Sequence, residues 1–467
     1  MTILQTALTS LADAMRACAE MRDRFVEDAD QRVAWSDLLA GSALYGRGDE
    51  LRGKSVLLAT KDQLTTIASL VELDGIARRV VLCPPDLPLE HFPYVIETAE
   101  IDGIVSDRAP KQFGKARSVV FMPCSRSLVL RPLNEEPRCE TEWVLLTSGT
   151  TGLPKLVAHT FASLTSAIQP SSTQGTGTVW STFYDIRRYG GLQILLRAAL
   201  TGTPLVLSGA EEPTADFLAR AGSSGVTHIS GTPSHWRRAL MSPSAHLLKA
   251  TYIRLSGEAV DQAILDHLRS AYPQARLVHA FASTEAGVGF EVKDGNAGFP
   301  EEVLTGTPNV EMKVEDSTLR IRSAGCARCY LGDGVPSFKD ETGFVSTSDV
   351  VELHNGRYYF AGRRDGVINV GGLKVHPEQV EAVISRHSDV HMCLVRAKKS
   401  PVTGALVLAE VVLNAGLPSV DRDAAAIKES ILEFCRAELP LHKVPALIKI
   451  VPSLALSGAG KVMRRDA

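Results

Sequence analysis

Short runs of β-branched and apolar residues alternate with amphipathic stretches between residues 55 and 285. The runs are SVLLAT, VVLCP, WVLLTSG, PLVLSG, YIRLSG and RLVHAFAS, which begin at residues 55, 80, 143, 204, 252 and 276. Such alternation is typical of βαβ units, in which a crossover helix joins two parallel strands. We therefore expect an α/β fold with parallel-rich, helix-covered sheets.

The pattern changes in the last third of the chain. Between residues 304 and 361, strand-like runs such as VEMKVED, LRIRS and RYYFAG follow one another closely, which predicts a β-rich subdomain. From Asp365 onward, helix-like PEQVEAVISRH and KESILEFCRAEL flank strand-like HMCLVRA and LVLAEVVL, a pattern that favours a compact α+β module. A chain of 467 residues is long enough for two domains, and we expect them at 1–364 and 365–467.

Composition excludes several classes of protein. The chain has 50 Lys and Arg against 53 Asp and Glu, a net charge of −3, and no block of like charge, so nucleic acid is not an expected partner. No apolar run reaches the roughly 20 residues that span a bilayer, and the first 25 residues interleave acids and bases. We expect no membrane span and a cytoplasmic protein.

The eight cysteines are irregularly spaced, which favours thiols in a reducing compartment over a disulfide framework. Cys326 and Cys329 form the only CxxC pair. A zinc or redox site is disfavoured because no second CxxC or nearby His pair completes a tetrahedral set of ligands.

The run TSGTTGLPK, from Thr147 to Lys155, follows the apolar run WVLL. Glycines let backbone N–H groups approach phosphate oxygens, hydroxyls add donors, and the Lys supplies a charge for the outer phosphates. It is not a Walker A loop, because Pro154 precedes Lys155 and Leu156 follows it. The loop can cradle ATP, although taken alone a solvent-exposed turn would be the better interpretation.

Five segments occur in a fixed order: TSGTTGLPK, FASTEAG at 281–287, TSDV at 347–350, GRRDGVINVGGLKVHPEQVE at 362–381 and SGAGKVMRR at 457–465. Together they resemble the acyl-adenylate-forming superfamily, which includes acyl-CoA synthetases, peptide-synthetase adenylation domains and firefly luciferase. The segments span about two thirds of the chain, so coincidence is a poor explanation.

The resemblance implies an ATP-dependent enzyme that converts a small-molecule carboxylic acid into its acyl-AMP and then transfers the acyl group to a thiol. The implied cofactors are ATP and Mg²⁺, with coenzyme A as the expected acceptor and a separate carrier protein as the alternative. It also implies that the N-terminal domain binds ATP and the acid, while a mobile C-terminal domain rotates about a hinge at Asp365.

The same resemblance implies where the nucleotide binds. The matching positions are Thr147, Ser148, Gly149, Thr150, Thr151, Gly152 and Lys155 in the loop, Gly257, Glu258 and Ala259 beside the adenine, and Phe281, Ala282 and Ser283 before the Thr-Glu pair. Asp349 and Arg363 match the pair that holds the ribose hydroxyls, although a structural ion pair near the hinge is the alternative.

The implied catalytic residues are Thr284, Glu285 and Lys461. Thr284 and Glu285 match the pair that contacts the α-phosphate and Mg²⁺, and carboxylate oxygen suits that ion. Read alone, Glu285 could be a helix-end carboxylate or part of a surface salt bridge. Lys461 matches the C-terminal lysine that offsets charge repulsion when a carboxylate attacks phosphorus. Without its SGxGK context it would be a solvated tail lysine.

A glycine-rich stretch near the hinge matches the segment that opens a path for the thiol acceptor. Its members are Gly371, Gly372 and Lys374. Small residues leave room for a pantetheine arm, and a tight turn is the competing interpretation.

The chain departs from the family pattern at three places. Phe281 and Ala282 stand where relatives have Tyr-Gly, and Glu258 replaces a usual Gly. The third place is STFYDIRRYGGLQ, 181–193, which has Tyr184, Asp185, Arg187 and Arg188 where acyl-CoA synthetases often have an aromatic residue and a His. The acid pocket is expected in this segment, with contributions from Tyr184, Asp185, Arg188 and Gly190. Asp185 could pair with the ammonium of an amino acid, or it could pair with Arg187 or Arg188.

Three functions remain open at this point. The preferred one is an AMP-forming acid:CoA ligase for an aryl or a short or medium acyl acid. The second is a stand-alone ligase for an amino or aminoaryl acid that loads a carrier protein or forms an amide. The third is a non-catalytic nucleotide-binding protein, against which the combination of Lys155, Glu285 and Lys461 argues.

Overall fold

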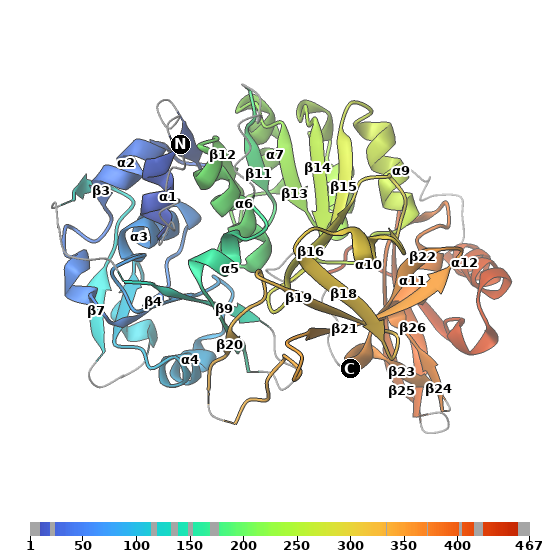
Figure 1. The fold of residues 1–467 in the computed structure, drawn as a ribbon. Helices are drawn as coiled ribbons and strands as arrows, with labels where there is room; N and C mark the ends of the chain where they lie inside the picture. Colours follow the sequence, from blue (N-terminus) through green and yellow to red (C-terminus); the bar gives the residue numbers. More distant parts are fainter. Residues whose placement is uncertain are drawn as a thin grey trace.

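The computed structural model describes residues 10–18, 24–113, 119–131, 139–147, 153–168, 177–332, 334–370, 372–400, 404–414 and 424–455. Two large sheets dominate these residues (Figure 1). The seven-stranded sheet runs β20 (Cys329–Tyr330), β10 (Lys155–His159), β9 (Glu142–Thr147), β5 (Arg79–Leu82), β4 (Ser55–Leu58), β6 (Gly103–Ser106) and β7 (Val120–Pro123). Four of its pairings are parallel, whereas β9–β10 and β10–β20 are antiparallel.

The second sheet has eight strands. Its order is β16 (Gly287–Val292), β15 (Arg276–Ser283), β14 (Tyr252–Ser256), β13 (His228–Gly231), β11 (Trp180–Thr182), β12 (Leu205–Leu207), β1 (Phe25–Glu27) and β2 (Arg32–Ala34). Only the two edge pairings, β15–β16 and β1–β2, are antiparallel. The predicted parallel-rich α/β architecture is confirmed, and all six predicted strand runs are strands.

Helices cover both faces of the two sheets because parallel strands carry apolar side chains on both sides. The helices are α1 (Leu11–Ala17), α2 (Trp35–Ala40), α3 (Gln63–Leu73), α4 (Phe92–Thr98), α5 (Phe161–Thr165), α6 (Tyr189–Thr201), α7 (Thr214–Ser223), α8 (Pro233–Leu240) and α9 (Gln262–Ala271). Helices α3 and α6 pack in the core shared by both sheets, α4 lies on the outer face of the first sheet, and α7–α9 on that of the second.

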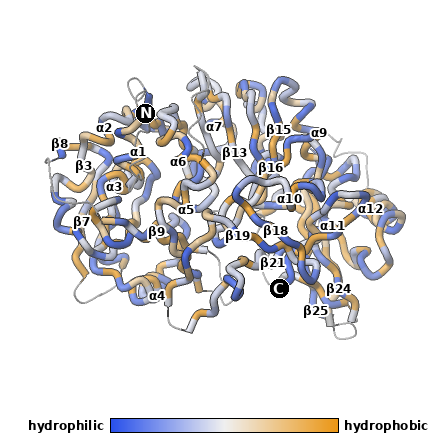
Figure 2. The backbone as a smooth tube through the Cα atoms, viewed as in Figure 1, coloured by the Kyte–Doolittle hydropathy of each residue, from blue (hydrophilic) through white to orange (hydrophobic). Residues whose placement is uncertain are grey.

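Alternation along single strands sets this layering. In β4, Val56 and Leu58 join the shared core, whereas Leu57 points into the outer core with α4. The outer helix α9 is amphipathic instead: Ile264, Leu265 and Leu268 are buried, and Figure 2 shows hydrophilic positions between the hydrophobic ones.

A five-stranded antiparallel sheet follows the second large sheet. It runs β17 (Phe299–Pro300), β22 (Arg357–Arg363), β21 (Val345–His354), β19 (Thr318–Ser323) and β18 (Val310–Glu315), with α10 (Val303–Gly306) beside it. Stacked and tilted rings of Phe281, Phe290, Phe299 and Phe360 fill its core. The closely spaced strand runs predicted for this stretch are therefore present.

The C-terminal part has a core of its own, built from residues between Ile368 and Ile448. Its strands are β24 (Leu373–Val375), β23 (Ile368–Val370), β26 (Gly404–Leu413), β25 (Val390–Ser400) and β27 (Leu447–Ile450), and its helices are α11 (Pro377–Ile384) and α12 (Ala424–Glu438). These elements lie at the end of the molecule opposite the seven-stranded sheet (Figure 1). Among the residues described, no helix is long and apolar enough to span a bilayer.

Candidate active site

The glycine-rich segment connects two antiparallel strands. Thr147 ends β9, Lys155 begins β10, and the two are direct cross-strand partners. The segment thus joins two antiparallel strands, whereas a Walker A loop leads from a strand into a helix. Thr147 and Lys155 mark its base, and the predicted ATP contacts Ser148, Gly149, Thr150, Thr151 and Gly152 fall outside the described residues.

A tight turn between β15 and β16 presents Thr284 and Glu285. The Ser283 hydroxyl accepts a 2.9 Å hydrogen bond from the Ala286 amide and so closes the turn. Gly287 follows with φ of +73°, and a Cβ there would lie 2.5 Å from the Gly325 carbonyl oxygen. Only glycine combines that backbone conformation with that approach. Sequence therefore fixes the turn on which the Thr-Glu pair sits.

Side chains from β10 and β20 hold both residues of the pair. His159 Nε2 lies 2.7 Å from the Thr284 carbonyl oxygen, and the Tyr330 hydroxyl donates to Glu285 Oε1 at 2.9 Å. The Ala327 amide also donates to the Glu285 carbonyl at 2.8 Å. Thr284 and Glu285 are therefore fixed from the neighbouring sheet.

His159 is a neutral structural donor. Burial lowers its pKa to about 4, an effect that the hydrogen bond to Thr284 opposes only in part. Its Nδ1 lies 3.0 Å from Ser163 Oγ, and its ring packs against Tyr189 with centroids 5.8 Å apart. A neutral imidazole donates through one nitrogen, so Nε2 carries the proton toward the Thr284 carbonyl.

The strand before the turn sends its side chains to opposite cores. Phe281 stacks on Phe290 and Phe360, with centroids 5.8 and 5.4 Å apart, whereas Ala282 packs against the core shared by the large sheets. The Phe281 ring is thus committed to the aromatic core. A phenol hydroxyl, as in the family pattern, would have to be accommodated there.

Asp349 and Arg363 face each other across β21 and β22 as direct cross-strand partners. The preceding residue, Ser348, has a φ of +60°, and the Asp349 amide donates to Thr347 Oγ1 at 3.2 Å. The pair is close enough for a joint role at the ribose, which stays a prediction.

The segment after β14 contains Gly257, Glu258 and Ala259. Gly257 and Ala259 are exposed, whereas the Glu258 carboxylate accepts from the Ser234 amide at 2.9 Å and from its hydroxyl at 3.0 Å. Ser234 lies in the first turn of α8, where the helix dipole favours an anion. The Glu258 side chain is therefore directed to the start of α8, whereas Gly257 and Ala259 on either side of it are exposed.

The predicted acid-pocket segment contains a buried ion pair. Arg187 Nε and Nη2 donate to the two oxygens of Asp185 at 2.8 and 2.6 Å, and Arg187 is only 1% exposed. Burial raises the pKa of Asp185, but the charge and hydrogen bonds of Arg187 outweigh it, so the pKa lies below its usual value. Of the two alternatives left open for Asp185, the structure shows pairing with Arg187.

The ion pair also ties the segment to the first sheet. Arg187 Nη1 donates to the Thr60 carbonyl at 2.7 Å, and the Ile186 amide donates to Gln63 Oε1 at 2.8 Å. Tyr184 is buried, and its hydroxyl lies 2.6 Å from the Ser256 carbonyl oxygen. Both large sheets therefore position this segment.

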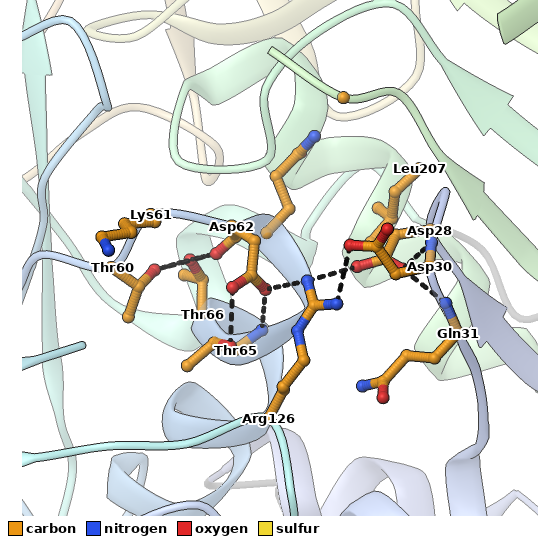
Figure 3. A network of polar contacts seen from close by, with 12 residues as sticks. Asp28, Asp30, Gln31, Thr60, Lys61, Asp62, Thr65, Thr66, Arg126 and Leu207 are labelled. Carbon is orange, nitrogen blue, oxygen red and sulfur yellow. Dashed lines mark hydrogen bonds and ion pairs between the residues drawn. The ribbon is translucent and has the colours of Figure 1, made fainter. Parts of the chain in front are cut away.

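The anchoring residues are themselves held in a polar network (Figure 3). The Thr60 hydroxyl donates to the Asp62 carbonyl at 2.9 Å, and Asp62 caps α3 through the Thr65 amide at 2.7 Å. Arg126 lies between Asp62, at 3.5 Å, and Asp28, at 3.1 Å. Thr60 and Gln63, which anchor the segment around Tyr184, are thus held in place by their own hydrogen-bonded neighbours.

The other predicted pocket residues lie at the start of α6. Arg188 pairs with Asp86, and Gly190 is so close to Tyr184 that a Cβ would lie 3.3 Å from its ring. Gly190 is therefore adjacent to the Tyr184 side chain, and the contact of Arg188 and Gly190 with an acid stays a prediction.

The C-terminal predictions lie on a different part of the fold. Gly372, with φ of +88°, and Lys374 are exposed at the β23–β24 hairpin, and Asp365 lies in the short helix Arg364–Gly366 between β22 and β23. Gly371 and Lys461 fall outside the described residues, so the structure does not place them.

His159 and Tyr330 lie outside the motifs that predicted the site. Each stands close to a segment that was singled out: His159 four residues after Lys155, and Tyr330 directly after the CxxC pair. Their strands, β10 and β20, pair with each other, a neighbourhood that periodicity cannot reveal.

The oxygen donor at the turn fits Mg²⁺. Glu285 Oε1 accepts the hydrogen bond of the Tyr330 hydroxyl, which leaves Oε2 for a hard cation that prefers oxygen and keeps most ligands as water or phosphate. In the parts of the chain that the structure covers, no three His, Cys, Asp or Glu side chains gather as a metal cluster. This includes the CxxC pair, in which Cys326 is buried and Cys329 exposed.

Two family models match most of the chain. The AMP-binding enzyme family matches residues 52–331, and the AMP-binding enzyme C-terminal domain matches residues 379–461. The chain therefore belongs to the AMP-binding enzyme family, as the motif order predicted.

Within this family, the chain is similar to several ligases of known name. The chain is 25% identical over 447 residues to a 2-succinylbenzoate–CoA ligase of Salmonella typhimurium, covering 93% of this chain and 92% of that one. It shares its fold with a benzoate CoA ligase from Burkholderia xenovorans (TM-score 0.80, 18% identity, 97% and 98% covered). The same holds for the anthranilate CoA ligase AuaEII in complex with anthranoyl-AMP (TM-score 0.79, 16% identity, 97% and 95% covered).

Proposed function

We propose that this protein is an AMP-forming acid–thiol ligase that activates an aryl carboxylic acid as its acyl-adenylate and transfers the acyl group to coenzyme A. The observation that carries the proposal is the turn at Thr284 and Glu285, held by β10 and β20 beside Lys155. The carboxylate of Glu285, which can bind a metal ion, therefore lies near the ammonium of Lys155, which can bind phosphate.

In the first half-reaction an acid oxygen attacks the α-phosphorus of ATP, and the bond to the bridging oxygen of pyrophosphate breaks. The attack brings two anions together, so cations that neutralise the phosphates lower the barrier. Lys155 would bind the outer phosphates, and Thr284 would orient the α-phosphate. Lys461 would contact the acid carboxylate and the α-phosphate.

Glu285 would hold Mg²⁺ through Oε2. When bound, the ion neutralises phosphate charge as pyrophosphate leaves. Asp349 and Arg363 would hold the ribose, and the exposed backbone of Gly257 and Ala259 would border the adenine. In this arrangement the nucleotide extends from the end of β14 to the β9–β10 hairpin.

The acid class follows from the segment around Tyr184. Phe183 stacks on His235 with centroids 5.3 Å apart, and Tyr184 contacts the same ring edge-on at 5.6 Å. Phe183, Tyr184 and His235 thus form an aromatic wall. Burial lowers the pKa of His235 to about 3, so this aromatic wall is neutral. Both Asp185 oxygens already accept from Arg187, which leaves no free carboxylate there for an amino acid's ammonium. An uncharged aryl group suits this wall, and the relatives act on succinylbenzoate, benzoate and anthranilate, as their names state.

In the second half-reaction the thiolate of coenzyme A attacks the acyl carbon, and AMP leaves with its electron pair. Gly372 and Lys374, exposed at the β23–β24 hairpin, would border the acceptor's path. The same role is predicted for Gly371, which lies outside the described residues. Asp365, between β22 and β23, would be the hinge about which residues 365–467 turn between the two steps.

The test is acid-dependent exchange of labelled pyrophosphate into ATP. The full-length protein, ATP and Mg²⁺ would be assayed with a panel of benzoate-type, short-chain, medium-chain and amino acids, and coenzyme A would then be added to the active mixtures. We expect exchange with aryl acids, formation of the aryl-CoA thioester, and loss of exchange in Lys461→Ala.

The controls separate the alternatives. Lys443→Ala removes a C-terminal lysine whose Nζ donates to Gln379 within the small domain, and it should retain exchange. Exchange confined to amino acids would contradict the aryl proposal. Exchange without thioester formation would contradict coenzyme A as the acceptor, and no exchange with any acid would favour non-catalytic nucleotide binding.

A further inference from the structure

Tyr330 lies close to Lys155 on β10 and to Glu285 on the β15–β16 turn. It belongs to the edge strand β20, which pairs with β10 so that Tyr330 faces Val157, two residues from Lys155 on the same strand. Side chains two apart on a strand share a face of the sheet. The phenol of Tyr330 consequently lies on the same side as the Lys155 ammonium.

The phenol contacts the predicted metal ligand directly. The Tyr330 hydroxyl donates to Glu285 Oε1 at 2.9 Å. Among the described residues, none donates a hydrogen bond to Oε2 of Glu285. One carboxylate oxygen is therefore fixed by a neutral donor, and the other is left to take a cation.

The ring of Tyr330 is itself held in place. It packs edge-on against Phe338, with centroids 4.8 Å apart and an interplanar angle of 74°. The Lys155 Nζ lies 5.1 Å from its centroid, within the range of a cation–π interaction. A ring fixed on two sides fixes the direction of its hydroxyl.

We propose that Tyr330 is a positioning residue that aims the Glu285 carboxylate at the metal and sets its spacing from Lys155. The inference rests on the proposed function, in which Glu285 binds Mg²⁺ and Lys155 binds phosphate. It adds a residue that the sequence motifs did not single out. Tyr330 touches neither acid nor phosphorus and acts only through its two neighbours.

The physical reason is orientational. A carboxylate with no partner rotates about its terminal bond and presents its oxygens in many directions, whereas one anchored oxygen restricts the other to a single direction. Partners of this kind around a metal ligand typically contribute about 10- to 100-fold to metal affinity. A neutral donor also leaves the carboxylate charge intact for the cation.

The experiment measures Mn²⁺ binding in the presence of saturating ATP by electron paramagnetic resonance, with no acid added. Mn²⁺ prefers the same oxygen ligands as Mg²⁺. The full chain would be compared with Tyr330→Phe, Glu285→Ala and the double variant. Tyr330→Phe keeps the ring and its packing, so its thermal unfolding should match that of the wild type. Tyr45→Phe, at a half-exposed tyrosine, is the matched control.

We expect Tyr330→Phe to raise the Mn²⁺ dissociation constant about 10-fold, Tyr45→Phe to leave it unchanged, and Tyr330→Phe to have no further effect in the Glu285→Ala background. An unchanged constant in Tyr330→Phe, or the same fold-loss in both backgrounds, would overturn the inference. Because binding is read without acid, a failure to activate any acid would contradict the proposed function and leave this result standing.

Discussion

Two acidic residues, Asp185 and Glu285, lie in segments that sequence reasoning placed at the site, and the structure uses them differently. Asp185 has both oxygens bound by the buried guanidinium of Arg187. Glu285 has one oxygen bound by a neutral phenol. The Asp185 carboxylate is thus used in an internal ion pair, whereas the Glu285 carboxylate has no ion-pair partner among the described residues and keeps one oxygen for a ligand.

Burial explains the difference. A charge removed from water needs an internal partner of opposite charge, and the 1% exposed Arg187 and 8% exposed Asp185 are each other's direct ion-pair partners. Glu285 lies at a turn between two strands and is partly exposed, so it needs no counter-ion from the protein. A charged residue near a pocket is therefore informative only once its partners are known.

The largest effect is expected from Asp185→Ala. It leaves the Arg187 guanidinium buried without its counter-ion, which should cost about 3–5 kcal/mol of unfolding free energy. Urea unfolding measures this, and Asp185→Ala/Arg187→Met should recover most of the loss. A variant that unfolds like the wild type but has a higher KM for the acid would instead make Asp185 a substrate ligand.

Removing the metal ligand should be the next largest effect. We expect Glu285→Gln to keep its fold and lose about 100-fold or more of acid-dependent pyrophosphate exchange, because a charge opposite the phosphates is gone. Glu341→Gln, at an exposed acid, is the matched control. Equal activity in the two variants would remove Glu285 from the mechanism.

A smaller effect concerns His159 and pH. Its folded pKa of about 4 lies below the ordinary 6.5, so protons bind the unfolded state more readily. Its contribution to stability is complete above about pH 6.5 and is lost as the pH falls toward 4, by about 1–3 kcal/mol. Urea midpoints of the wild type and His159→Gln should therefore converge as the pH falls through that range. Parallel pH profiles would contradict the assignment.

The order of motifs predicted the family, and the strand runs predicted the parallel-rich architecture, because both depend on short segments read in sequence. Tyr330 and His159 could not be predicted because they contact the Thr-Glu pair across the fold. Their strands β20 and β10 pair with each other, and their side chains reach the β15–β16 turn. Cys326 and Cys329 stood out as a CxxC pair, whereas the side chain that contacts Glu285 belongs to the next residue, Tyr330. The buried pairing of Asp185 likewise depends on Thr60, which is distant in the chain.

The smallest effect is expected at Glu258. Glu258→Gln retains a carbonyl oxygen for Ser234 but loses the charge at the start of α8, which should cost about 0.3–1 kcal/mol. Thermal unfolding reads the change, and the KM for ATP should stay constant because the side chain turns toward α8. A raised KM for ATP would place the Glu258 carboxylate at the adenine.

In the proposed reaction the acid carboxylate attacks the α-phosphorus of ATP. The most direct test uses an aryl acid labelled with ¹⁸O in both carboxylate oxygens, with ATP, Mg²⁺ and coenzyme A, followed by mass spectrometry of the products. We expect one ¹⁸O in AMP, none in pyrophosphate, and one in the thioester. Label in inorganic phosphate together with ADP would show attack on the γ-phosphorus and contradict the proposed reaction.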